Sequence, residues 1–257
     1  MVTDNLRTSN INTTDKEKEG KKPKDRKETK KSKVMSIVTI VCSIFFVILL
    51  LIGSCVIFHN VYFKSFWVNG QSMYPTLNMN ALDANGNLKG KNPKNPSSES
   101  GARVDYGIMD TNAFAIDNLQ RFNIIVTKFS DYDSSNYVKR IIALPGESYS
   151  FTKTGELYIN GEYVEQPIGE EYIKETYMAH KTEHMSGTLK EDEYFVCGDN
   201  RGHSDDSRSH GPIKKRYIIG KAVAIEGMCT LEKKYNTQTS LYEWNCINIS
   251  YHWPKFL

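Results

Sequence analysis

The sequence predicts a mainly β domain of antiparallel strands that follows a single N-terminal transmembrane helix. Two observations favour this fold class. Residues 34–58 contain no charged side chain. After residue 60 the apolar runs are short, rich in β-branched and aromatic residues, and separated by Gly, Asn and Pro, as is typical of strands and turns. No part of this later region has the pattern of a long amphipathic helix.

The apolar segment near the N-terminus is long enough to span a membrane. As a helix, Val34–Phe58 would be about 37 Å long, and a bilayer has a hydrocarbon core about 30 Å thick. The segment is too long for the apolar part of a cleaved signal peptide. No small-x-small cleavage site follows it before the aromatic residues at 62–67. We therefore expect residues 34–58 to form a membrane anchor.

The distribution of charge predicts how this anchor is oriented. Residues 1–33 contain eleven Lys or Arg and six Asp or Glu, a net charge of +5, whereas the whole chain carries +3. A basic tail next to an apolar segment favours a membrane surface as its partner over nucleic acid, with an RNA-binding arm as the alternative. The positive-inside rule puts this tail, which we expect to be disordered, in the cytoplasm. Residues 59–257 are then extracytoplasmic, in a single-pass protein of the cell membrane.

The region 59–257 is expected to be a β domain with two polar interruptions. Residues 83–110 are rich in Gly, Pro, Ser and Asn and predict an exposed insertion, and the charged residues 170–193 predict a short helix or a loop. Asn160–Gly161 between two apolar runs is a strong hairpin signal. The expected strands are Phe122–Phe129, Tyr137–Leu144, Ser148–Phe151, Leu157–Ile159, Tyr163–Val164, Tyr194–Cys197 and Tyr217–Ile225.

Five cysteines give no sign of a metal site. Cys42 and Cys55 lie in the apolar segment, and Cys197, Cys229 and Cys246 are isolated along the chain without a C-x-x-C pair. A fold without disulfides is the simpler assumption, although a bridge such as Cys229–Cys246 stays open. We expect neither a metal nor a cofactor.

The first stretch with candidate chemistry is Val68–Leu77, with the sequence VNGQSMYPTL. Ser72 lies between a flexible Gly70 and Pro75, and the proline forbids a regular helix through this point. A serine on such a turn is well placed to be exposed as a nucleophile. Most serines in turns, however, only bond to nearby backbone groups, so the position alone is weak evidence.

The second stretch, Tyr137–Glu147, has two adjacent cations, Lys139 and Arg140, inside an apolar β pattern. Alternation along a strand does not decide which of them points inward. A lysine with an ordinary pKa of about 10.4 is charged at neutral pH, but loss of water lowers that pKa. A pKa of about 8 requires roughly 3 kcal/mol of differential destabilisation. Arginine stays protonated, so only Lys139 could act as a base. The alternative is a strand lysine whose amine reaches water.

The third stretch, Gly198–Arg208, has the sequence GDNRGHSDDSR and follows an apolar strand. Such a loop is usually a hydrogen-bonded turn, but it could also supply a hydroxyl that orients an amine and an Asp–Arg pair that braces the site.

Together these three stretches, in this order behind one membrane anchor, resemble the signature segments of bacterial type I signal peptidases. That resemblance implies a mostly β fold and a Ser–Lys dyad, with Ser72 in G-x-S-M-x-P-T-L as nucleophile and Lys139 in YVKRIIALPGE as general base. It also implies supporting positions: Ser204 to position the lysine, Asp206 with Arg208 as an ion pair, Asp199 as a structural aspartate, and Met73 and Gly70 beside the nucleophile.

Two positions depart from the family pattern. Asn123 stands where many members have an aspartate, which affects a loop contact. Gly70 stands where some members have a serine in the oxyanion hole, so the hole would depend on backbone N–H groups, chiefly that of Ser72.

The function implied by the resemblance is cleavage of signal peptides from exported precursors at Ala-x-Ala sites, without metal or cofactor. The partners would be signal-peptide-bearing precursors, the lipid bilayer and the nearby secretion translocon. The alternatives are a catalytically inactive, membrane-tethered binding or scaffold protein of the same fold, and a self-cleaving repressor-type protease. The apolar span argues against the second, because such repressors are soluble.

Three further patterns are interpreted as chance. His180–His184 matches H-x-x-E-H, but its segment is too short and polar for a zinc-peptidase helix. Ser150–Lys153 matches S-x-x-K, but it lies in a predicted strand and hairpin. His203 and His210 are expected to be loop residues.

Overall fold

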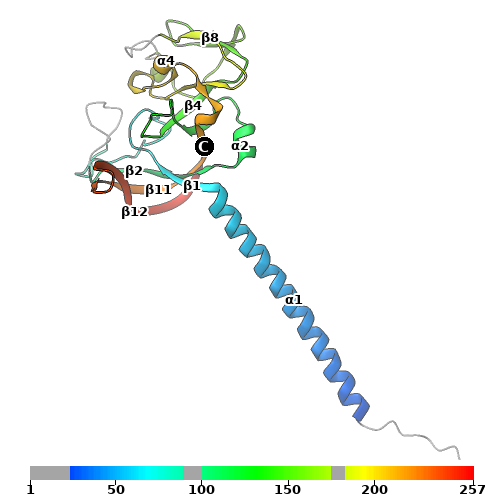
Figure 1. Ribbon diagram of the computed structural model, residues 1–257. Helices are drawn as coiled ribbons and strands as arrows, with labels where there is room; N and C mark the ends of the chain where they lie inside the picture. Colours follow the sequence, from blue (N-terminus) through cyan, green and yellow to red (C-terminus); the bar gives the residue numbers. More distant parts are fainter. Residues whose placement is uncertain (1–23, 89–99, 175–182) are drawn as a thin grey trace, which may run out of the picture. The chain divides into compact units, whose positions relative to one another are not determined.

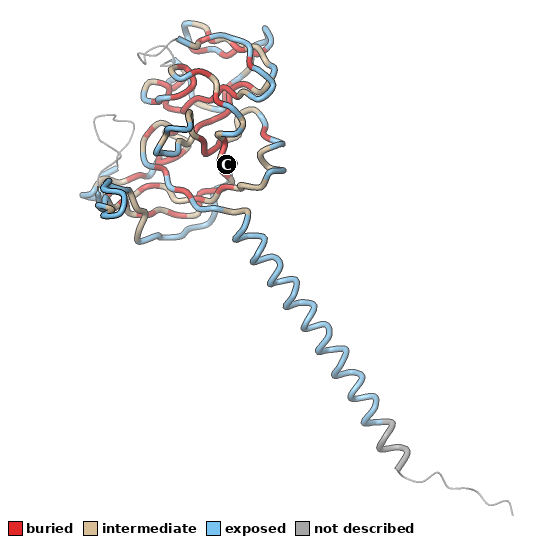
Figure 2. The backbone as a smooth tube through the Cα atoms, in the orientation of Figure 1, coloured by how far each residue is buried: buried red, intermediate tan, exposed pale blue. Residues whose placement is uncertain are grey.

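The computed structural model describes residues 24–88, 100–174 and 183–257, which fall into two compact units, 1–57 and 58–257. The first unit consists of most of helix α1 (Lys24–Tyr62). From Lys30 to Tyr62 this helix is long and apolar enough to cross a membrane, with a mean hydropathy of 3.1. Its described side chains in this unit are exposed (Figure 2), as expected for a helix whose solvent is lipid. The predicted apolar helix is confirmed.

The second unit contains two antiparallel sheets, which confirms the predicted fold class (Figure 1). Strand β11 is the centre of the larger, eight-stranded sheet, because it pairs with β2, β3 and β12. The order along this sheet is β1 (Phe63–Trp67), β2 (Arg103–Asp110), β11 (Ile218–Asn236), β3 (Ile124–Thr127), β4 (Tyr137–Ala143), β9 (Glu193–Cys197) and β10 (Ile213–Lys214), with β12 (Leu241–Phe256) on β11.

The smaller sheet has four strands in the order β7 (Glu162–Val164), β6 (Leu157–Ile159), β5 (Ser148–Phe151) and β8 (Ser186–Thr188). Asn160 and Gly161 form the predicted hairpin turn between β6 and β7, with φ angles of 51° and 85°. Both residues are of the types that tolerate this left-handed backbone.

Short helices make up the rest of the regular structure in the described residues. They are α2 (Ala113–Asp117), α3 (Glu170–Ile173), α4 (Ser207–His210) and the 3₁₀ helices η2 (Arg201–His203) and η3 (Lys215–Tyr217). Helix η2 lies within the Gly198–Arg208 stretch, and α4 begins inside it at Ser207 and ends two residues after it. Helix α3 lies in the charged segment 170–193, where a short helix or a loop was predicted.

The structure corrects the predicted insertion at 83–110. Residues Arg103–Asp110 form β2, an internal strand that pairs with both β1 and β11. Arg103, Asp105 and Asp110 carry polar groups at positions that are only partly buried, so the sequence of the strand looks like a loop. The polar part of the insertion therefore ends before Ala102, which is fully buried, and residues 89–99 lie outside the described residues.

Strand β12 was not predicted, and β11 extends beyond the predicted Tyr217–Ile225. The two form a long hairpin in which Asn236 pairs with Leu241 and Ala224 with Phe256. A disulfide between Cys229 and Cys246 joins these strands, so the simpler assumption of a fold without disulfides is wrong. Most of β12 is exposed, and polar residues such as Glu243, Asn245 and Ser250 interrupt its apolar side chains, so the strand has no long apolar run.

Candidate active site

Ser72 lies on a turn that is fixed by the apolar residues next to it. We call residues 68–78 the Ser72 turn. Met73 and Leu77 are completely buried in a cluster with residues of β1, β3 and β11. The Leu77 N–H also donates to the Met73 carbonyl at 2.9 Å. The turn is thus anchored to the large sheet, while Ser72 itself is only partly buried.

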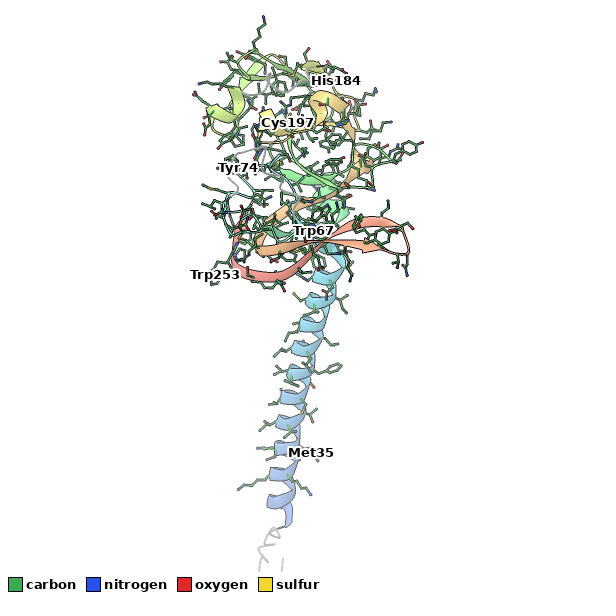
Figure 3. The ribbon with its side chains drawn as sticks, turned by 90° about the vertical axis from the view of Figure 1, so that its left-hand side faces the viewer. Met35, Trp67, Tyr74, His184, Cys197 and Trp253 are labelled. Carbon is green, nitrogen blue, oxygen red and sulfur yellow. A yellow bond between two sulfur atoms is a disulfide. The ribbon has the colours of Figure 1, made fainter. Side chains whose placement is uncertain are left out.

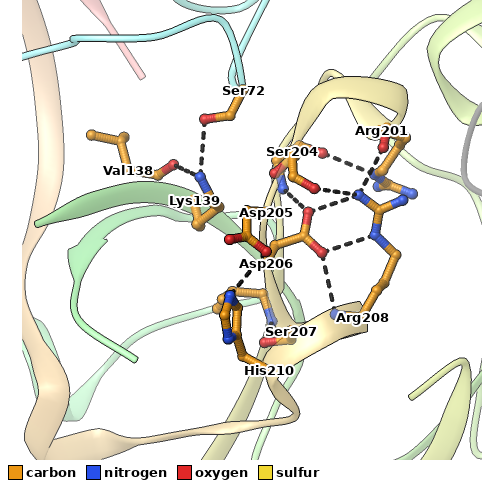
Figure 4. Close-up of polar contacts among 12 residues, drawn as sticks. Ser72, Val138, Lys139, Arg201, Ser204, Asp205, Asp206, Ser207, Arg208 and His210 are labelled. Carbon is orange, nitrogen blue, oxygen red and sulfur yellow. Dashed lines mark hydrogen bonds and ion pairs between the residues drawn. The ribbon is translucent and has the colours of Figure 1, made fainter. Parts of the chain in front are cut away.

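The amine of Lys139 lies next to the hydroxyl of Ser72. Lys139 Nζ is 2.9 Å from Ser72 Oγ and 3.1 Å from the Val138 carbonyl oxygen (Figure 4). The lysine is 97% buried and makes no ion pair among the described residues. Burial lowers its pKa to about 8, against the opposing effect of the carboxylates of Asp206 and Asp205. A substantial fraction of the amine is therefore neutral at mildly alkaline pH.

Arg140 follows Lys139 in β4 and makes a different set of contacts. Its Nε and Nη2 atoms donate to the two oxygens of Asp199 at 2.7 and 2.6 Å, and its Nη1 donates to the Phe122 carbonyl at 2.8 Å. The Asp199 carboxylate also accepts a hydrogen bond from the Thr76 hydroxyl. Asp199 therefore links β4, the end of β9 and the Ser72 turn. Lys139 and Arg140 are both buried, and because consecutive side chains of a strand point to opposite faces, each face of β4 has one buried cation.

The ion pair predicted in the third stretch is present and buried. Arg208 Nε and Nη2 donate to the two oxygens of Asp206, each at 2.8 Å (Figure 4). Asp206 also accepts from the Gly198 N–H at 3.0 Å. Burial by itself would raise the pKa of Asp206, but the Arg208 charge and these hydrogen bonds hold it below its usual value.

The same loop holds the backbone of the nucleophile through residues that the motif analysis did not single out. The N–H of Asn200 donates to the Ser72 carbonyl at 2.9 Å, and its Nδ2 donates to the Gln71 carbonyl at 3.1 Å. Arg201 donates to Gln166 Oε1 at 2.6 Å, which ties the loop to the chain beyond β7. The sequence indicated Asn200 and Arg201 only through their position within GDNR, and it gave no indication that Gln166 belongs to the site.

Ser204 lies beside the dyad but does not bond to the lysine. Ser204 is 94% buried, and its hydroxyl is one of the groups that lower the pKa of the neighbouring Asp206. Its oxygen packs against Gly198, where a Cβ would collide with Ser204 Oγ and with the Ser72 carbonyl oxygen. A role for Ser204 in positioning Lys139 stays a prediction.

Gly70, two residues before Ser72, has a φ of 137°, which favours glycine. Its carbonyl accepts a hydrogen bond from Asn78 Nδ2 at 2.8 Å. With no side chain at this position, any oxyanion donor here must come from the backbone, and that role also stays a prediction.

The end of β12 reaches the Ser72 turn. Lys255 Nζ donates to the Thr76 carbonyl at 3.3 Å, and Leu257 packs on the cluster that contains Met73 and Leu77. Earlier in the same strand, Trp253 is 93% exposed on the outer surface (Figure 3).

The patterns interpreted as chance are not part of the contact between Ser72 and Lys139, although His203 and His210 lie in or just after the loop beside it (Figure 4). Ser150 belongs to β5 in the smaller sheet. His203 is in η2, and His210 pairs with Asp205 at 2.9 Å. His180 lies outside the described residues. Across the described ranges, no group of three or more His, Cys, Asp or Glu could hold a metal ion.

A β fold in which a buried lysine amine meets a serine hydroxyl on a turn defines a class of candidate Ser–Lys hydrolases. The family model for signal peptidase, peptidase S26, matches residues 37–226 of this chain. The match covers well over half of the sequence, so the chain belongs to this family of proteases. Residues 227–257, with most of the β11–β12 hairpin, lie beyond the matched segment.

Two bacterial signal peptidases and one solved structure are similar to this chain to different extents. Signal peptidase I of Pseudomonas aeruginosa is 31% identical over 155 residues, which are 47% of this chain and 55% of that protein. Signal peptidase IB of Staphylococcus aureus is 28% identical over 205 residues, covering 76% of this chain and 90% of the relative. A crystal structure of a signal peptidase I from Enterococcus faecalis is 32% identical, covers 40% of this chain and 96% of that one, and has a TM-score of 0.33. The chain thus spans about half the length of the Pseudomonas relative.

Proposed function

We propose that this protein is a membrane-anchored serine endopeptidase that removes N-terminal signal peptides from exported precursors. Ser72 is the nucleophile and Lys139 the general base. The observation that carries the proposal is the 2.9 Å separation of Lys139 Nζ and Ser72 Oγ, with burial lowering the pKa of the amine to about 8. Membership of the signal peptidase family supplies the substrate class.

The reaction begins with proton transfer inside the dyad. Neutral Lys139 takes the proton of the Ser72 hydroxyl as the oxygen attacks the carbonyl carbon of the scissile peptide. The resulting ammonium then protonates the leaving amine, which releases the mature protein and leaves the signal peptide as an ester on Ser72. Lys139, neutral again, removes a proton from water, and hydrolysis of the ester restores the serine.

The oxyanion formed in each step requires hydrogen-bond donors that are already in place. The backbone N–H of Ser72 is the chief donor in this proposal, because residue 70 is a glycine. Asn200 supports that arrangement by holding the carbonyl of Ser72 at 2.9 Å, which fixes the peptide plane on the other side of the residue. The extended residues before the cut would pair with a strand edge beside Ser72, with small side chains at the Ala-x-Ala positions.

The apolar helix is the basis of the proposed location. Lys30, Lys31 and Lys33 precede the uncharged span, so the tail would stay in the cytoplasm and the β domain would lie outside a single-pass anchor. The substrate's own signal helix lies in the same bilayer. Anchoring both molecules in one membrane, close to the secretion translocon, raises their effective concentration.

The test is cleavage of a purified precursor with an Ala-x-Ala site by the full-length protein in phospholipid vesicles. N-terminal sequencing of the product locates the cut. Ser72→Ala should abolish cleavage without lowering the melting temperature by more than a few degrees. Cleavage at the wild-type rate by this variant would remove Ser72 from the chemistry. Precursor binding without cleavage by the wild-type protein would favour an inactive binding protein instead.

A further inference from the structure

The Ser72 turn has to leave β1 and return toward β2 while it holds one hydroxyl against Lys139. Its apolar anchors, Met73 and Leu77, follow the nucleophile. Val68, at the start of the turn, is buried in the same cluster, but Asn69 and Gly70 do not belong to it. A small side chain at the far end of the turn holds this part of the backbone.

Asn78 closes the turn on itself. Its Nδ2 group donates two hydrogen bonds, to the Val68 carbonyl at 2.6 Å and to the Gly70 carbonyl at 2.8 Å. These acceptors are ten and eight residues earlier in the chain. Asn78 is 98% buried, and its bond to the Val68 carbonyl is buried as well, which limits competition from water. The carboxamide thus joins the last residue of the turn to two of its first three residues, Val68 and Gly70.

Asp105 of β2 fastens the closed turn to the large sheet. The Asn78 N–H donates to Asp105 Oδ2 at 2.6 Å, and the Asp105 N–H donates to Asn78 Oδ1 at 2.8 Å. The Val68 N–H donates to the Asp105 carbonyl at 3.0 Å. One residue of β2 therefore contacts both ends of the turn.

The position requires an asparagine for two separate reasons. Its φ is +60°, a left-handed conformation that only glycine and asparagine or aspartate adopt readily. Its side chain must also donate twice and accept once, which glycine cannot do and which an ionised aspartate cannot do as donor. Asn78→Gly therefore removes the three side-chain bonds without adding backbone strain.

We propose that Asn78, held by Asp105, is a positioning residue that fixes the Ser72 turn and so sets the distance between the serine hydroxyl and the Lys139 amine. The proposal rests on the proposed function, because its effect is measured through Ser72 chemistry. A misplacement of about 1 Å at a reacting atom can cost on the order of a hundredfold in rate. We call the hydrogen bonds of Asn78 with Val68, Gly70 and Asp105 the clamp. The loss falls on kcat, because the clamp holds the nucleophile and not the substrate.

The experiment compares two asparagine-to-glycine variants of the full-length protein in vesicles. Asn78→Gly should lower kcat at least tenfold and change KM less than threefold. The matched control is Asn160→Gly, at the β6–β7 turn, where φ is also positive and Oδ1 also accepts a backbone hydrogen bond, from Ser148 at 2.9 Å. That variant should keep kcat within twofold. If Asn78→Gly keeps the wild-type kcat while the wild-type protein cleaves, the clamp is refuted.

A second pair of variants covers the possibility that Asn78→Gly does not fold. Asp105→Asn keeps an oxygen that can accept from the Asn78 N–H, whereas Asp105→Ala removes it, so Asp105→Asn should keep several-fold more kcat. Equal loss in both variants counts against the clamp.

Hydrogen exchange of the backbone amides at 68–78 is independent of activity and should accelerate in Asn78→Gly but not in Asn160→Gly. If the wild-type protein cleaves no precursor, the proposed function fails. The clamp is tested separately by hydrogen exchange, and it is refuted if the amides at 68–78 exchange equally fast in Asn78→Gly and in the wild-type protein.

Discussion

Lys139 and Arg140 are consecutive residues of β4, and their side chains make contacts on opposite faces of the strand, where both are buried. Lys139 contacts the Ser72 hydroxyl and has no carboxylate partner in the described part of the chain, whereas Arg140 makes a bidentate ion pair with Asp199. The two cations are therefore in different electrostatic environments, although they are neighbours in the chain. One can lose its proton, and the other remains charged and holds the neighbouring loop.

The pH dependence of cleavage follows from the setting of Lys139. Its pKa is about 8, so about a tenth of the amine is neutral at pH 7. The value of kcat/KM should rise about tenfold per pH unit below pH 8 and level off above it, as the base loses its proton. Steady-state assays between pH 6 and 10 measure this. Lys139→Arg should be inactive throughout, because arginine keeps its proton. A profile that is flat between pH 6 and 9 contradicts the proposed base.

The lowered pKa of Lys139 also predicts that its side chain destabilises the folded protein. The pKa of the amine is about 8 in the folded protein and 10.5 for an ordinary lysine exposed to water, so below pH 8 the folded state buries a charge that the unfolded state hydrates. The penalty is roughly 3 kcal/mol below pH 8 and fades as the pH rises from 8 to 10.5. Lys139→Met should therefore raise the free energy of unfolding by up to about 3 kcal/mol at pH 7, and by less at pH 10.

Denaturant titrations of Lys139→Met and of the wild-type protein at several pH values test this. Ser72→Ala serves as the control, since it changes the site without removing the buried amine. A stabilisation by Lys139→Met that is the same at pH 7 and pH 10 would show that the gain comes from packing and not from the charge.

Much of the fold was predictable because short apolar runs and turn residues specify strands directly. Ser148–Phe151 and Leu157–Ile159 have the predicted bounds, and so does the turn at Asn160–Gly161. The strands that were missed, β2 and β12, mix polar and apolar side chains at their less buried positions. Their place in the sheet depends on pairing with β11, which is a long-range property that local sequence patterns do not contain.

The site was predictable only as far as its motifs extend. Ser72 and Lys139 are 67 residues apart, and no periodicity indicates that they meet; the resemblance to a family does. Asn78 and Gln166 could not be found in this way, because a single asparagine or glutamine in a loop is common and its role depends on three-dimensional contacts. Hydrogen bonds that cross between loops are decided by the folded geometry.

Removing one partner of the buried ion pair between Arg140 and Asp199 should be strongly destabilising. Removing the carboxylate in Asp199→Ala leaves a buried guanidinium without its partner, which typically costs about 3–5 kcal/mol. Removing both charges in Arg140→Met/Asp199→Ala should cost less than Asp199→Ala alone. The exposed pair Lys215–Asp117, at 2.7 Å, is the control, and Asp117→Ala should change stability by less than about 1 kcal/mol. Denaturant unfolding of the four proteins measures these differences, and equal losses from the two aspartate variants would contradict the prediction.

Gly198 should be intolerant of even one added methyl group. An alanine Cβ there would overlap the Ser72 carbonyl oxygen and the Ser204 hydroxyl, and the first of these is backbone that cannot rotate away. The loop would have to move relative to the Ser72 turn, which displaces the nucleophile from Lys139. We expect Gly198→Ala to reduce kcat/KM at least a hundredfold. Gly187→Ala, in β8, is the matched control, because its Cβ would meet only the end of the Tyr149 side chain at 3.2 Å, and it should stay within a few-fold of wild type. Cleavage assays with both variants, each checked for folding by thermal melting, test the prediction, and a fully active Gly198→Ala would show that the contact between loop and turn does not position Ser72.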